Sequence, residues 1–135
     1  MKQNLEPRCV IQENAKRVIE LHERMHVTFM LRDTSPEARA EWSRACSDFQ
    51  RQYDALAFPG GYSAALEAIP TGNGRAIEDA LAFLEVRPYF FRSQYIGTKL
   101  TRLLKHAPLT TRQLERLQRV LESEKQRKKR KTTKA

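Results

Sequence analysis

Apolar residues recur every three or four positions along most of the chain, which is the spacing of a buried helix face. Breaks that contain Pro or Gly separate these stretches. The chain has only five Gly and six Pro, which favours long helices over many short strands. The pattern predicts helices over residues 9–31 (or from 12), 36–58, 62–69, 75–87, 89–106 and 110–124.

These stretches predict a single compact all-α domain of about five or six helices packed as antiparallel helical hairpins. A chain of 135 residues suits one domain with one core. We expect that core around Trp42, Phe49, Phe83 and the apolar stripe of residues 96–104. The domain is expected to span residues 1–124, because apolar residues end there.

The net charge of +9 is unevenly distributed. Residues 1–58 hold nine basic and nine acidic residues, and residues 59–124 hold nine and seven. The tail, residues 125–135, holds seven lysines and arginines and no acid, so most of the excess lies there. We expect this tail to be disordered or a fraying helical extension. Such a run is typical of a contact with nucleic acid or of a nuclear import signal, or it only keeps the protein in solution.

A second concentration of positive charge lies between Val86 and Leu114, where no acidic residue occurs. Helical spacing places several of these cations on one sector of the helix 89–106, beside its apolar sector. With interleaved tyrosines they could pair with phosphates and stack on bases, or receive an acidic protein surface; the alternative is a solvated helix face. The candidate binding residues, including those of the tail, are Arg87, Arg92, Tyr95, Lys99, Arg102, Lys105, His106, Arg112, Lys128, Lys129, Arg130 and Lys131.

One motif has the form of a catalytic site. His22-Glu23-Arg24-Met25-His26 matches H-E-x-x-H and over these five residues resembles the zinc metalloproteases called zincins. The resemblance implies zinc bound by His22 and His26, with Glu23 as general base. Helical spacing points both histidines into the apolar face, where hydrogen-bonded core histidines are the alternative. Arg24 departs from the usual uncharged position of zincins.

No downstream motif marks a third zinc ligand, although Glu78, Asp79 and His106 are available. Other enzyme classes are not indicated, because the glycine pairs lack the Lys-Ser/Thr of a phosphate-binding loop and neither Ser nor Cys lies in a nucleophile signature. Cys9 and Cys46 fit no CxxC spacing, which favours a reduced cytosolic chain.

The N-terminal residues lack the apolar run of a signal peptide, and no stretch approaches the ~18 apolar residues of a membrane span. We therefore expect a cytoplasmic protein with no membrane partner, or a nuclear one if the source is eukaryotic. The sequence favours a non-enzymatic binding module without a cofactor, which binds an acidic protein or nucleic acid through the basic residues of 87–112 and the tail. The alternative is a zinc-dependent hydrolase built on His22, Glu23 and His26. No heptad seam predicts a coiled coil, and the oligomeric state is left open.

Overall fold

The computed structural model describes residues 6–133 and confirms the all-α class. Within this range the chain forms six helices and no strand. None of the helices in the range is long and apolar enough to cross a membrane. In chain order they are α1 (Pro7–Leu31), α2 (Pro36–Ala57), α3 (Tyr62–Ala68), α4 (Gly74–Val86), α5 (Ser93–His106) and α6 (Thr111–Thr133).

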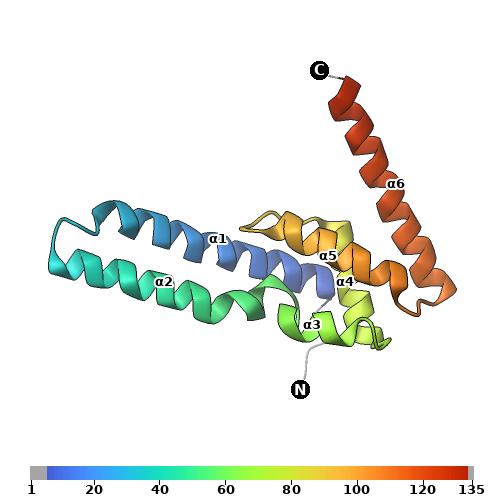
Figure 1. The fold of residues 1–135 in the computed structure, drawn as a ribbon, viewed down its shortest axis with the longest axis horizontal. Coiled ribbons are helices and arrows are strands. Elements are labelled where there is room, and N and C mark those ends of the chain that lie inside the picture. Colours follow the sequence, from blue (N-terminus) through green and yellow to red (C-terminus); the bar gives the residue numbers. More distant parts are fainter. Residues whose placement is uncertain (1–5, 134–135) are drawn as a thin grey trace.

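The two longest predicted stretches form an antiparallel hairpin, α1 and α2, which extends away from the rest of the molecule (Figure 1). The turn between them is set by a local cap. The Ser35 hydroxyl accepts a hydrogen bond from the backbone N–H of Ala38 at 3.0 Å, and Pro36 takes the first helical position. The helix boundary therefore follows from two consecutive residues, Ser35 and Pro36.

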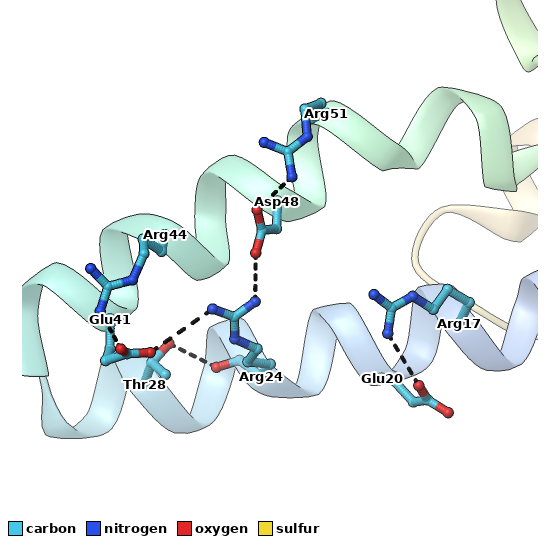
Figure 2. Close-up of polar contacts among 8 residues, drawn as sticks. All are labelled: Arg17, Glu20, Arg24, Thr28, Glu41, Arg44, Asp48 and Arg51. Carbon is cyan, nitrogen blue, oxygen red and sulfur yellow. Dashed lines mark hydrogen bonds and ion pairs between the residues drawn. The ribbon is translucent and has the colours of Figure 1, made fainter.

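Charged side chains join the two arms of the hairpin. Arg24 of α1 donates to Asp48 of α2 at 2.7 Å and lies 3.9 Å from Glu41, while Asp48 also accepts from Arg51 (Figure 2). The hydrogen bond from Arg24 lowers the pKa of Asp48. Arg24, the unusual member of the H-E-x-x-H stretch, thus binds the neighbouring helix.

The core is centred on α4, which contacts α1, α5 and α6. This helix is apolar on most of its circumference, so it can be covered on several sides. Ile77, Ala80 and Leu81 of α4 are at most 1% exposed. Phe83 is also buried, as predicted, and packs against Phe58 with ring centroids 6.0 Å apart.

The loop between α4 and α5 covers residues 87–92 and contains Pro88, which disfavours helical geometry at the residue before it. Arg87 and Arg92 both adopt left-handed backbone angles, with φ of 54° and 66°. The Tyr53 hydroxyl donates to the carbonyl of Phe91 at 2.6 Å, and the Ser93 hydroxyl accepts from the N–H of Phe90 at 3.1 Å. These two bonds hold a loop whose backbone is strained at both ends.

Helix α6 begins with a capping box. The Gln113 N–H donates to the Thr110 hydroxyl at 3.1 Å, and the Thr110 N–H donates to the Gln113 side chain at 3.0 Å. The buried Leu117 packs in the core, and beyond it α6 leaves the body of the protein (Figure 1). For the tail, the structure describes helix as far as Thr133, while residues 134–135 lie outside the described residues.

Two expectations about the core were wrong. Trp42 is only half-buried and lies outside the core cluster. On α1, the helical spacing of apolar residues predicted a buried face, but Ile19, Phe29 and Met30 are 44%, 39% and 68% exposed. The reason is that the far part of α1 packs against α2 on one side, and no third helix of the described chain covers its other side (Figure 1).

Candidate functional site

Helices α5 and α6 diverge from the loop at residues 107–110 like the arms of a V (Figure 1). The groove between them is closed at its base by the end of α4 and by the loop that follows it. Its volume is about 690 Å³. We call it the basic groove, and we define it by its apolar floor (Leu84, Gly97, Val120, Leu121) and its cations (Arg87, Arg102, Lys105, Lys128).

The floor of the basic groove is apolar because α4 and α6 pack there incompletely. Leu84, Val120 and Leu121 are each half-buried at the edge of the core. Gly97 contributes no side chain to the α5 wall, and a Cβ built on it would approach Leu84 Cδ2 only to 3.8 Å. Apolar surface is therefore left accessible at the bottom of a cleft, where a ligand could cover it.

The cations of the basic groove come from three separate elements. Arg87 lies in the α4–α5 loop, Arg102 and Lys105 lie on α5, and Lys128 lies on α6. Arg102 and Lys105 are exposed and make no ion pair within residues 6–133. Two of the four positive charges are therefore available to an incoming anion.

Glu124 is the one acidic residue among the described residues that line the basic groove. Its carboxylate lies 3.3 Å from Arg87 Nε and 3.5 Å from Arg127 Nη1. The pair with Arg87 is 46% and 43% exposed, so it is a weak surface contact that a competing anion can replace.

The structure separates the basic residues predicted from the sequence into those that line the basic groove and those that do not. The projection of α5 groups Arg92, Tyr95, Lys99, Arg102 and His106, but of these five residues only Arg102 lines the basic groove. The α5 wall is made instead by Gln94, Thr98, Thr101 and Lys105, with Arg102 at its edge. Of the tail residues, only Lys128 lines the groove; Lys129 and Arg130 are exposed, and the side chain of Lys131 lies outside the described residues.

Arg112 does not line the basic groove; it lines a second, neighbouring open pocket, which contains an ion-pair network. There Arg116 donates two hydrogen bonds to Glu85, at 3.0 and 2.8 Å, and one to Glu78 at 2.8 Å. Arg8 of α1 donates to Glu85 as well, at 3.0 Å. The hydrogen bond from Arg116 lowers the pKa of Glu85, which ties α6 to α4 through charged groups. We assign this network a structural role, because its charges are already paired.

The H-E-x-x-H stretch lies in the middle of α1, but its histidines do not point into the core. His22 and His26 are both exposed, which corrects the expectation of an inward-facing pair. The His22 ring stacks on Phe91 at 4.9 Å, with an angle of 21° between the rings. The described residues contain no group of three or more His, Cys, Asp or Glu side chains placed to hold a metal ion, so the zinc hypothesis gains no third ligand from them and stays a prediction.

The four cations of the basic groove were identified from the sequence, but the apolar residues of its floor were not. Leu84, Val120 and Leu121 have the spacing of core residues, and only the angle between α5 and α6 leaves them accessible. Tyr89, which is 84% exposed at the edge of the groove, was noted only as an interleaved aromatic. Comparisons with protein-family models, with curated protein sequences and with solved structures found no match.

Proposed function

We propose that this protein is a non-enzymatic binding module and that the basic groove binds an acidic segment of a partner protein. The observation that carries the proposal is the combination of an apolar floor with unpaired cations above it. Arg102 and Lys105 can pair with carboxylates, and Arg offers two parallel donors for a single carboxylate.

The apolar floor favours protein over nucleic acid. Nucleic acid is bound chiefly through its phosphates, which gain nothing from the half-buried Leu84, Val120 and Leu121. A protein segment can cover these side chains and at the same time pair its carboxylates with the cations. The tail adds attraction at longer range, which raises the association rate more than it selects a partner.

The experiment compares two polyanions that differ in the anionic group. Fluorescently labelled poly-L-glutamate and a single-stranded oligonucleotide are titrated with the full chain at several salt concentrations. Lys105→Glu reverses a charge inside the basic groove, and Lys99→Glu reverses one on the same helix outside it. We expect Lys105→Glu to weaken poly-L-glutamate binding at least roughly fivefold, consistent with one lost charge pair of about 1 kcal/mol, and Lys99→Glu to weaken it less than twofold.

Three outcomes contradict the proposal. Equal losses from Lys105→Glu and Lys99→Glu would show that the whole positive surface binds and the groove does not. If only the oligonucleotide binds, and Lys105→Glu alone weakens it, the groove is a nucleic-acid site. A salt-sensitive loss on reversing Lys129 and Arg130, without any effect in α5, would assign the binding to the tail.

A further inference from the structure

The α5 wall of the basic groove repeats with the period of a helix. Its lining residues Gln94, Thr98, Thr101 and Lys105 follow at intervals of four, three and four positions, so they form one straight ridge. At 1.5 Å per residue this ridge is about 16 Å long, or three turns. The groove is therefore straight over a length that a short helix can match.

The hydroxyl groups of the ridge donate their hydrogen bonds within α5. The Thr98 hydroxyl donates to the Gln94 carbonyl at 3.0 Å, and the Thr101 hydroxyl donates to the Gly97 carbonyl at 2.8 Å. These hydroxyls are therefore already hydrogen-bonded within their own helix. With Gly97 between them, the wall is shallow enough for another backbone to approach closely.

Charge complements this shape. Arg102 and Lys105 lie toward the closed end of the V, whereas Arg87 and Lys128 lie on the other elements that line it. An occupant should therefore carry acids on the flank that meets Arg102 and Lys105, with an apolar stripe beside them. We infer that the basic groove binds an acidic amphipathic helix of about three turns, whose apolar residues at i, i+3 or i+4 and i+7 cover Leu84, Val120 and Leu121.

This inference rests on the proposed function and specifies the ligand further. A site that acted through charge alone would bind any acidic chain. A site for a helix also requires that the apolar residues of the ligand recur at helical spacing. In both cases the carboxylate of Glu124 is the internal competitor, because it lies 3.3 Å from Arg87. Replacing it by Gln should raise the affinity for an acidic ligand roughly two- to fivefold, the equivalent of a surface ion pair.

The test is a selection from a phage-displayed library of random peptides of about 16 residues, enough for four helical turns. The full chain is the target, and Lys105→Glu is used for counter-selection. We expect enriched peptides to combine Asp or Glu with Leu, Ile or Phe at helical spacing. The most enriched sequence is then synthesised with a fluorescent label, and its affinity is measured by anisotropy.

Two variants of the floor decide between shape and charge. Gly97→Leu fills the groove without changing charge, and Val120→Ser removes apolar area if the first variant does not fold. Leu114→Ser is the matched control, because Leu114 is 46% exposed on α6 and does not line the groove. We expect the groove variants to weaken the peptide at least roughly fivefold, as for about 1 kcal/mol of apolar contact, and the control less than twofold.

The failures are distinguishable. If acidic peptides without helical period are enriched, or if the floor variants bind as the wild type does, the helical inference is wrong while the proposed function stands. If no peptide depends on Lys105, both are wrong.

Discussion

Asp79 is a buried carboxyl without a complete set of partners. It lies in α4 and is 4% exposed. Its Oδ2 is 3.5 Å from Arg75 Nε, while its Oδ1 is buried and accepts no hydrogen bond from the described residues. Burial raises the pKa of Asp79. Nearby Arg75 lowers this pKa by less than burial raises it, and Glu78 adds the smallest effect, a further rise. Ionisation of Asp79 therefore destabilises the folded state.

The sign of the pH effect follows from that shift. An Asp in the unfolded chain has a pKa of about 3.9, and the folded pKa lies above it. The protonated group therefore favours folding below the unfolded pKa, and that stability is lost as the pH rises through the folded pKa. Asp79→Asn removes the charge and keeps the shape. At neutral pH we expect it to raise the free energy of unfolding by about 1–2 kcal/mol, which is the usual cost of a buried unsatisfied acceptor.

Urea unfolding followed by circular dichroism, at a series of pH values from about 3 to 8, measures this difference. The expected stability gain is smallest at acid pH and grows toward neutrality. Any constant effect of the new amide group cancels in the pH dependence. Glu67→Gln, which removes an exposed carboxyl in α3, controls for the change in net charge. A gain that is independent of pH, or that grows toward acid pH, would refute the reasoning.

Three further substitutions test the packing, each by chemical unfolding. Arg116→Met removes three hydrogen bonds to Glu85 and Glu78 and should cost about 2 kcal/mol near neutral pH. Because the pKa of Glu85 is lowered, this cost should shrink as the pH falls through the folded pKa; an undiminished cost at acid pH would contradict the role of charge. Gly97→Ala should stabilise α5 by about 0.5–1 kcal/mol, since its Cβ meets no atom closer than 3.8 Å, and a destabilised variant would contradict that. Trp42→Ala should cost about 1–2 kcal/mol, below the ~3–5 of a fully buried aromatic, and a cost in that upper range would return Trp42 to the core.

The helices could be predicted from the sequence because their limits are local. Ser35 and Pro36 determine the start of α2, and Thr110 with Gln113 determines the start of α6. These groups act within four residues, so the spacing of the sequence contains the information. The location of the core could be predicted only in part. Periodicity shows that Met30 shares a face with buried residues, but it does not show that α4 ends before reaching it.

The candidate site could be predicted less well, for a different reason. Helical projection groups cations on one sector of α5, but which residues line a groove depends on the neighbouring helices. Arg102 and Lys105 line the basic groove, whereas Lys99 does not. The apolar floor could not be distinguished from core, because Val120 and Leu121 have the same residue types and spacing as the buried Leu117.

The positive charge around the basic groove opposes its closing. Leu117 and Arg116 fix the first turns of α6 on α4, and the last contact of α6 with the body that we identify is the exposed pair between Arg87 and Glu124. Beyond it the tail is cationic, and Arg102 and Lys105 place further positive charge on α5; like charges repel one another, and salt screens this repulsion over a Debye length of about 8 Å at physiological ionic strength. This repulsion opposes a collapse of α6 onto α5 that would otherwise bury the apolar floor. An acidic ligand removes the repulsion and covers the floor in the same step, so the charge that keeps the groove open also selects the ligand that fills it.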